Sequence, residues 1–337
     1  MNYSSADGPR DDTIIEVDGL TKVYGDVRAL DGVSFTARRG SVLGLLGPNG
    51  SGKTTTVRVL STLLRADSGL ATVLGHDVAT EPARVRRRIG LTGQYAAVDE
   101  ALTGIDNLVL IARLLDLPRR TARARADELI DRFALRDAAR RRVRTYSGGM
   151  RRRLDLAASL IGRPDVLFLD EPTTGLDPRH RNEVWESVRA LADEGVTVLL
   201  TTQYLEEADQ LANDLVVLDS GKVIASGTAS ELKARVGGRR LHVRPSETAD
   251  VPTATAIVAE LTGAAPSVDP SGEITAPAAE QALLHRAGDR LDASGVAVAE
   301  IGLRLPSLDD VFLTLTGRTA PDADAATDAA IDKETAA

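Results

Sequence analysis

The sequence predicts an α/β fold with a largely parallel sheet, followed by a small α+β module. Three short apolar runs, at 41–46, 166–169 and 196–201, predict buried strands. A segment with the apolar spacing of a helix follows each run, and strands that alternate with helices form parallel sheets. After the two glycines at 237–238 the pattern changes to short strands and helices, which are expected at 241–243, 253–261, 278–291 and 296–305.

The other elements follow from local signals in chain order. Residues 14–35 alternate short apolar runs with turns, as in an antiparallel β-region. Asp219-Ser220-Gly221 separates apolar runs at 215–218 and 222–225 and therefore predicts a hairpin. Helical spacing predicts further helices at 54–64, 106–117, 121–133, 151–160, 179–194 and 205–213. Pro118 separates the second of these from the third.

Composition excludes several classes of protein. A net charge of −8 argues against non-specific nucleic-acid binding, which needs a basic face. The absence of cysteine excludes disulfides, thiolate catalysis and cysteine metal sites. No apolar run approaches the ~20 residues that cross a bilayer, and residues 1–12 lack the apolar core of a signal peptide. We therefore expect a soluble intracellular chain that takes any membrane role from a partner.

The segment between the first predicted strand and the first predicted helix matches the P-loop pattern. Its glycines let the backbone curl so that N–H groups point at phosphate oxygens, and the next helix presents its positive N-terminus. Lys53 is expected to reach the β and γ phosphates, and the Thr54 hydroxyl to bind Mg²⁺. The alternative is a glycine-rich turn with an unrelated lysine. The expected phosphate-binding residues are Gly47, Pro48, Asn49, Gly50, Ser51, Gly52, Lys53, Thr54 and Thr55.

Two acidic residues end the second predicted strand. Asp170 closes this strand, where a carboxylate beside a P-loop can hold Mg²⁺ through water. Glu171 follows it and is expected to polarise the attacking water as general base. A solvated acidic turn would be the simpler interpretation if the P-loop were absent.

A second helix start also has the composition of an anion site. Ser147 is a natural N-cap, and Gly148 and Gly149 would let a phosphate approach the helix N-terminus closely. Because the chain already has one phosphate loop, this helix is expected to serve the nucleotide of another subunit. Taken alone, the same residues predict a plain serine-capped helix.

These motifs, in this order, resemble the nucleotide-binding domain of ABC transporters over about residues 14–230. Ser147 to Gly149 is similar to the family signature, although Tyr146 and Met150 replace the commoner leucine and glutamine. The resemblance implies that the nucleotide is ATP, with Mg²⁺. It also implies an ATPase that works as a homodimer, with one subunit's P-loop facing its partner's signature.

The resemblance assigns roles to three further residues. Tyr24 matches the aromatic residue that stacks on adenine. Gln94 matches the glutamine that senses Mg²⁺ and takes part in catalysis, and Asp177 lies in a segment similar to the D-loop. Without the resemblance, Tyr24 could be a half-buried strand residue, Gln94 a surface residue and Asp177 the start of the turn at Pro178.

One position departs from the general family. Gln203 follows the third buried strand, where most ABC ATPases carry a histidine. A glutamine can hydrogen-bond a γ-phosphate or a water but cannot take up a proton, so we expect Gln203 to act as a neutral sensor. This segment, residues 92–95 and residues 306–317 resemble the daunorubicin/doxorubicin-resistance branch of ATP-binding subunits. By itself, 306–317 predicts an amphipathic helix packed on a small sheet.

The resemblance implies a RecA-like core, an antiparallel β subdomain and a helical subdomain at about 95–163. The predicted domains are 13–236 for nucleotide binding and 237–317 for the accessory module. The polar ends, 1–12 and 318–337, are expected to be disordered, the second as an acidic tail.

The function implied by the resemblance is that of the ATPase subunit of an exporter. It would lie at the cytoplasmic face of the cell membrane, bound to a separate permease, and drive efflux of an anthracycline-like drug. Export of a lipid or another natural product is an alternative. A non-transport ABC ATPase is less well supported because the chain has one set of motifs and no sustained heptads.

Overall fold

The structure is a computed structural model that describes residues 12–93, 98–236, 239–278, 282–304 and 306–316. Its contacts divide the chain into two compact units, residues 1–228 with 320–337, and residues 229–319. Each unit has its own hydrophobic core and is described by itself. The unit boundary lies before the predicted one at 236 because helix α8 (Ala229–Val236) packs against helix α11 (Leu308–Thr316) of the second unit.

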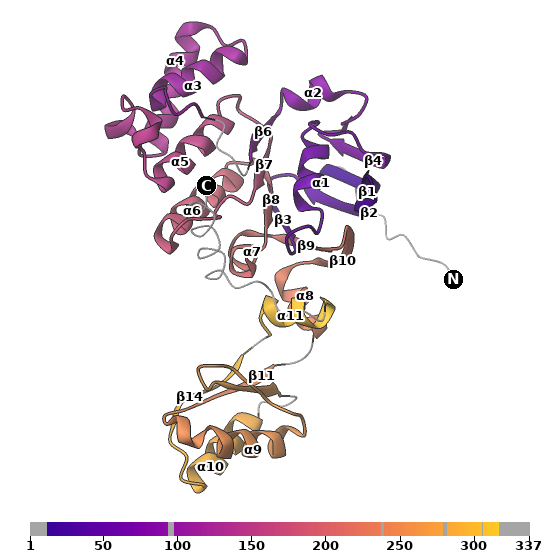
Figure 1. The fold of residues 1–337 in the computed structure, drawn as a ribbon, viewed down its shortest axis with the longest axis vertical. Coiled ribbons are helices and arrows are strands. Elements are labelled where there is room, and N and C mark those ends of the chain that lie inside the picture. Colours follow the sequence, from indigo (N-terminus) through magenta and orange to yellow (C-terminus); the bar gives the residue numbers. More distant parts are fainter. Residues whose placement is uncertain (1–11, 94–97, 237–238, 279–281, 305, 317–337) are drawn as a thin grey trace. The chain divides into compact units, whose positions relative to one another are not determined.

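The first unit contains the predicted α/β core (Figure 1). Its six-stranded sheet has the order β10-β9-β3-β8-β7-β6, and only the β9–β10 pair is antiparallel. The central strands are buried at every residue, which explains their uninterrupted apolar runs. The strands of this sheet are β3 (Val42–Leu46), β6 (Ile89–Thr92), β7 (Val166–Asp170), β8 (Thr197–Thr202), β9 (Asp214–Asp219) and β10 (Lys222–Gly227).

Alternate residues of these strands enter two different cores. On one face, Phe168 packs with helix α1 (Lys53–Leu60) and with an antiparallel sheet. That sheet has the order β2-β1-β4-β5 and confirms the antiparallel region predicted at 14–35. Its strands are β1 (Thr13–Tyr24), β2 (Val27–Arg38), β4 (Ser68–Val73) and β5 (His76–Asp77), and α2 (Pro82–Arg86) follows them.

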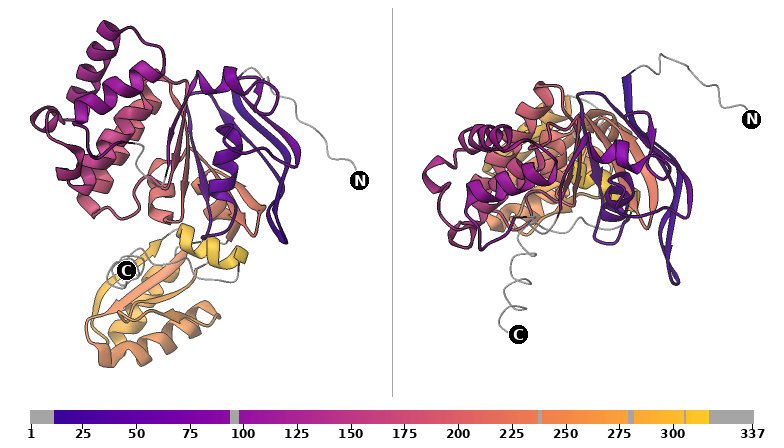
Figure 2. Two further views of the ribbon diagram at one scale, coloured as in Figure 1. Left: turned by 45° about the horizontal axis from the view of Figure 1, so that its top comes forward. Right: turned by 90° about the horizontal axis from the view of Figure 1, so that it is seen from above.

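The opposite face packs against helices. Leu167 and Leu169 share a core with Trp185 of helix α6 (Pro178–Asp193) and with a group of helices that forms a separate lobe in Figures 1 and 2. In α4, the buried residues recur at Ala122, Ala126, Leu129 and Ile130, which is the spacing of a helix with one apolar face. The group contains α3 (Gly104–Leu114), α4 (Arg119–Arg132) and α5 (Gly148–Ser159), and α7 (Leu205–Leu211) follows β8.

Some predicted bounds were too long and some elements were missed. The helix predicted at 54–64 ends at Leu60, and Thr62 beyond it has a left-handed backbone with φ of 65°. Strands β4, β5 and β6 and helices α2 and α8 were not predicted. Strand β4 reads Ser-Gly-Leu-Ala-Thr-Val, and its first three residues are exposed, so it carries little apolar signal.

The second unit has the βαββαβ order of a ferredoxin-like fold. Its sheet order is β12-β13-β11-β14, and Leu241, Ile274 and Leu291 lie in its core. The elements are β11 (Arg240–Pro245), α9 (Val251–Thr262), β12 (Ser267–Val268), β13 (Ile274–Pro277), α10 (Ala282–Ala293) and β14 (Val298–Arg304). Within the described ranges of both units, no helix is long and apolar enough to cross a membrane.

Candidate active site

The phosphate loop joins β3 to α1 in the first unit. Gly52, the N-cap of α1, has φ of 107°, and a Cβ there would lie 2.7 Å from the Ala29 carbonyl oxygen. A Cβ on Gly47 would lie 2.3 Å from the Leu218 carbonyl oxygen on β9. Both positions therefore require glycine. The first N–H groups of α1 have no intrahelical acceptor, so this end of the helix can bind an anion.

Lys53 is folded back over the loop. Its side chain is 4% exposed, and Nζ donates to the carbonyl oxygens of Gly47 at 2.7 Å and Pro48 at 3.1 Å. Nζ also lies 3.5 Å from Oε1 of Glu171. Burial lowers the pKa of Lys53, and the Glu171 carboxylate opposes this shift. The ammonium group is thus held where the P-loop pattern requires a cation, and phosphate oxygens could replace the two carbonyls.

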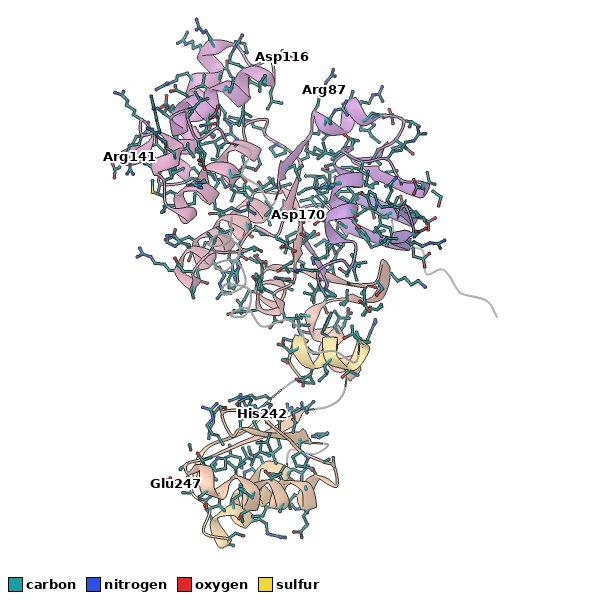
Figure 3. The ribbon with its side chains drawn as sticks, in the orientation of Figure 1. Arg87, Asp116, Arg141, Asp170, His242 and Glu247 are labelled. Atoms are coloured by element: carbon teal, nitrogen blue, oxygen red, sulfur yellow. The ribbon has the colours of Figure 1, made fainter. Side chains whose placement is uncertain are left out.

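Asp170 lies at the end of β7, in the interior of the first unit (Figure 3). Its Oδ1 accepts hydrogen bonds from Thr54 Oγ1 at 3.2 Å and from Thr201 Oγ1 at 2.6 Å. The carboxylate and the Thr54 hydroxyl are hard oxygen ligands of the kind that Mg²⁺ prefers. Among the residues that the structure describes, no cluster of three His, Cys, Asp or Glu could hold a metal by itself. Mg²⁺ sites in proteins usually combine one or two carboxylates with phosphates and waters.

Glu171 has a left-handed backbone, with φ of 50°. Its N–H donates to Thr201 Oγ1 at 3.0 Å, and its carbonyl oxygen accepts from Arg152 Nη2 at 3.3 Å. Non-glycine residues in this region of φ/ψ are strained and persist only where their surroundings hold them. The Glu171 carboxylate faces Lys53, with Oε1 3.5 Å from Nζ.

Gln203 lies directly after β8, at the same edge of the sheet. The preceding residue, Thr202, accepts a hydrogen bond from the Gly47 N–H at 3.3 Å, so Gln203 follows a strand end bound to the phosphate loop. Its side chain is 8% exposed, and its buried Oε1 has no hydrogen-bond partner among the residues that the structure describes. A buried amide oxygen without a partner is unusual and indicates a group that bonds to water or to a ligand.

The second predicted anion site has the expected local form. Ser147 caps α5 by accepting the Met150 N–H at 3.3 Å, and Ser147 and Gly148 are exposed. A Cβ on Gly149 would lie 2.2 Å from Cδ2 of His180, so only glycine fits beneath this ring. Asp177 caps α6 and pairs with His180 Nδ1 at 2.5 Å. The segments predicted as signature and D-loop are therefore packed together.

A groove of about 840 Å³ joins several of these residues. Asn49 of the phosphate loop and Glu171 contribute to its lining, as do Gly148 at the start of α5 and Gly175 before α6. One open groove is thus lined by the candidate base, the edge of the phosphate loop and the second helix start. Polar groups that converge in a groove are the usual mark of a ligand site.

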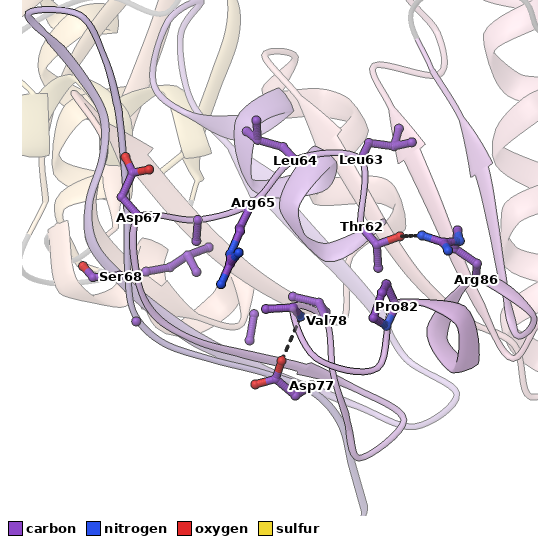
Figure 4. Close-up of a pocket in the computed structure, with 15 residues that line it drawn as sticks. Thr62, Leu63, Leu64, Arg65, Asp67, Ser68, Asp77, Val78, Pro82 and Arg86 are labelled. Carbon is purple, nitrogen blue, oxygen red and sulfur yellow. Dashed lines mark hydrogen bonds between the residues drawn. The ribbon is translucent and has the colours of Figure 1, made fainter.

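A second hollow, of about 380 Å³, lies beside the antiparallel sheet (Figure 4). Its lining includes Arg65, Asp77 and Arg86, and Arg86 donates to Thr62 Oγ1 at 3.2 Å. None of the residues predicted to bind nucleotide lines it. It is therefore separate from the site built around Lys53 and Asp170.

One predicted residue, Tyr24, takes no part in the contacts above, and another, Gln94, is outside the described part of the chain. Tyr24, at the end of β1, is 44% exposed, and its ring centre lies 5.7 Å from Nζ of Lys22. An exposed ring of this kind is available for stacking. Gln94 lies outside the described residues, immediately after Gly93.

Sequence reasoning missed two residues that hold the site together. Thr201 bridges Asp170 and the backbone of Glu171, and Arg152 binds the carbonyl of Glu171. Thr201 could have been found as a polar residue near the end of a buried strand, because buried hydroxyls need partners. Arg152 has no such signal, since it is the middle of three consecutive arginines.

Comparison with known proteins agrees with this geometry. Residues 30–174 match the family model described as ABC transporter. The chain is 56% identical over 305 residues to the daunorubicin resistance ATP-binding protein DrrA2 of Streptomyces coeruleorubidus, which covers 90% of this chain and 95% of the relative. The chain belongs to the ABC transporter ATP-binding proteins of the daunorubicin/doxorubicin-resistance family. As a member of this family it is a nucleotide-binding ATPase.

Other relatives of this ABC ATPase carry different names. It is 50% identical over 315 residues to the doxorubicin resistance ATP-binding protein DrrA of Mycobacterium tuberculosis, across 91% of this chain and 94% of the relative. It is 40% identical over 323 residues to the Nod factor export ATP-binding protein I of Ralstonia nicotianae, across 94% of this chain and 99% of the relative. A solved subunit of the Clostridium perfringens ABC transporter complex cbiONQ has a TM-score of 0.62 and 27% identity, across 66% of this chain and 92% of that one. The α/β fold predicted for the ABC ATPase is thereby confirmed.

Proposed function

We propose that this ABC ATPase hydrolyses ATP in a head-to-tail homodimer and thereby drives efflux through a separate membrane permease. The observation that carries the proposal is the cluster of Lys53, Asp170 and Glu171 at one edge of the sheet. Lys53, proposed to bind phosphate, forms an ion pair with Glu171, the proposed base. Asp170, the proposed metal ligand, accepts hydrogen bonds from Thr54 and Thr201 beside them. A protein that only binds ATP would need no base at this position.

In the proposed reaction, a water oxygen attacks the γ-phosphorus while the bond to the β-γ bridging oxygen breaks. Glu171 takes the proton of the attacking water, and ADP and inorganic phosphate leave. Lys53 and the backbone N–H groups of residues 49–55 would hold the phosphates. Thr54 and Asp170, with Gln94, would hold Mg²⁺, which compensates the charge of the phosphate oxygens when bound. Gln203 would bond the γ-phosphate or the water without transferring a proton.

The dimer follows from the second helix start. Ser147 to Gly149 would bind the γ-phosphate of the partner's ATP. Asp177 would contact the partner subunit, and Tyr24 would contact adenine. Two ATP molecules buried between subunits favour the closed dimer, and hydrolysis removes the contacts that hold it closed. Residues 13–236 would act as the nucleotide-binding domain and 237–317 as an accessory module.

The cargo is proposed from the relatives. Three relatives that are 56%, 57% and 52% identical to the chain are named for daunorubicin or doxorubicin resistance, which favours an anthracycline-like drug. The permease would hold the chain at the cytoplasmic face of the membrane. The Nod factor relative supports the second candidate, export of another natural product. Co-purification with a permease, followed by ATP-dependent efflux of daunorubicin from vesicles, tests the proposal, and efflux of other cargo alone would favour the second candidate.

Substitution of the base tests the chemistry. Glu171→Gln should bind ATP, accumulate a dimer on size exclusion and lose about a hundredfold or more in turnover, since general-base catalysis contributes 10²–10⁴-fold. Lys53→Ala should lose binding and turnover together. Glu186→Gln, the same change at an exposed position of α6, is the control. Rapid turnover by Glu171→Gln would reject Glu171 as the base.

The neutral sensor has its own test. Gln203→Ala should turn over ATP well below the wild-type rate, because its buried amide would no longer bond the γ-phosphate or the water. Gln203→His should retain activity, since an imidazole can also donate a hydrogen bond. Wild-type turnover by Gln203→Ala would remove this residue from the mechanism.

A further inference from the structure

Arg152 connects α5 to the two chain segments that flank the candidate base. Its Nε donates to the Pro172 carbonyl oxygen at 2.6 Å, and Nη1 donates to the Gly93 carbonyl oxygen at 3.0 Å. Nη2 donates to the carbonyl oxygen of Glu171 at 3.3 Å. The guanidinium group therefore binds the backbone on both sides of the site, after β7 and after β6.

The neighbouring arginines do not share this role. Arg151 forms an ion pair with Glu100 at 3.1 Å, and Arg153 donates to the Phe133 carbonyl oxygen at 3.3 Å within the helical group. The Arg152 side chain is only 13% exposed, and its Nη1 lies 3.4 Å from Oδ2 of the buried Asp155. Arg152 thus places a positive charge in the interior, beside a buried carboxylate.

The contact with Glu171 bears on the strain in its backbone. Thr201 binds the N–H of Glu171 and Arg152 binds its carbonyl group, so both peptide groups that flank its side chain are fixed. A left-handed backbone at a non-glycine residue relaxes when such contacts are removed. Arg152 therefore helps to keep the Glu171 carboxylate turned towards Lys53.

The same helix begins with Ser147 and Gly148, which are proposed to face the partner's ATP. Arg152 lies about five residues further along α5, roughly 7.5 Å at 1.5 Å per residue. A helix of 12 residues moves as a rigid rod over this distance. Because hydrogen bonds weaken steeply with distance and angle, a shift of α5 by about 1 Å would alter the three carbonyl contacts of Arg152.

We propose that Arg152 is a positioning residue that couples the two ATP sites of the dimer. The partner's γ-phosphate, bound at the start of α5, would fix Arg152 and through it the Glu171 of the chain's own site. This inference rests on the proposed dimeric ATPase. It predicts that hydrolysis at one site depends on the nucleotide at the other, a positive coupling carried within one chain.

The test compares Arg152→Lys and Arg152→Gln in the full chain, with Arg153→Lys as the matched control. Lysine keeps the buried charge but cannot bind three divergent carbonyls, and glutamine keeps one donor group without the charge. The rate of ATP hydrolysis is measured as a function of ATP concentration. Binding of a non-hydrolysable ATP analogue is measured by equilibrium titration, and folding is checked by circular dichroism. Arg152→Gln serves as the second variant if Arg152→Lys does not fold.

We expect wild type and Arg153→Lys to hydrolyse ATP with a Hill coefficient above 1. Arg152→Lys should bind the analogue within about twofold of wild type, while kcat falls about tenfold and the Hill coefficient approaches 1. Arg152→Gln should lose more activity than Arg152→Lys. A merely structural role would lower the melting temperature and leave the Hill coefficient unchanged.

The outcomes separate this inference from the proposed function. If the wild-type chain neither hydrolyses ATP nor dimerises, the proposed function fails. If the wild type is cooperative and both Arg152 variants keep its Hill coefficient and kcat, the coupling role of Arg152 is overturned while the proposed function stands.

Discussion

Replacing Thr201 with valine removes two hydrogen bonds of the active site while keeping the shape of the side chain. Thr201 Oγ1 donates to Asp170 Oδ1 at 2.6 Å and accepts the Glu171 N–H at 3.0 Å. Thr201 and Asp170 are both buried, at 0% and 4% exposure, so water cannot replace the lost bonds. The substitution should therefore lower both the free energy of unfolding and the rate of ATP hydrolysis.

The magnitude follows from the two bonds. A hydrogen bond to a charged group contributes about 1.5–3 kcal/mol to stability. The Glu171 N–H keeps a second acceptor, the Thr201 carbonyl oxygen at 3.2 Å. Loss of its hydrogen bond to the Thr201 hydroxyl therefore costs less than the ~1 kcal/mol of a neutral hydrogen bond. Thr201→Val should thus lower the free energy of unfolding by roughly 2–3 kcal/mol.

Trp185 supplies the assay. It is the single tryptophan of the chain and is 6% exposed in the first unit, so its fluorescence in urea reports the unfolding of that unit alone. The control is Thr197→Val on the same strand, where the hydroxyl only accepts the Gly40 N–H at 2.9 Å. This variant should lose about 1 kcal/mol and keep its ATPase activity. A Thr201→Val chain as stable as wild type, or no less active than Thr197→Val, would refute the reasoning.

Two further predictions concern Glu207 of α7 and Gly47 of the phosphate loop. Burial raises the pKa of Glu207 above its usual 4.5, so the wild type loses stability as pH rises through that raised pKa. Glu207→Gln does not titrate at this position, so its melting temperature by circular dichroism should gain on that of the wild type as the pH rises above 4.5. A difference that stays constant with pH would contradict this. Gly47→Ala would place a Cβ 2.3 Å from the Leu218 carbonyl oxygen and should abolish ATP binding by equilibrium titration. Gly288→Ala in α10, where a Cβ meets nothing within 4 Å, should bind ATP normally, and equal binding by both would contradict the clash.

The local motifs of the site could be predicted because each lies within a few consecutive residues. The phosphate loop, the acidic end of β7 and the serine cap of α5 were predicted from residue order, and the structure has a loop, a strand end and a capped helix there. Helix starts were predictable because caps act within one turn, as Ser147 does with Met150. Strand β4 and helix α8 were not, because their short segments carry weak periodicity.

Sequence by itself determined the chemistry available to this protein: a lysine in a glycine-rich loop, two carboxylates after a buried strand, and a glutamine where an imidazole is common. Tertiary structure alone decided how these groups are held. Thr201 lies 30 residues from Glu171, and the order of the sheet makes β8 the neighbour of β7. Arg152 reaches Gly93 across 59 residues. Periodicity records which residues are buried but not which strands become neighbours, so contacts between distant segments appear only in the folded chain.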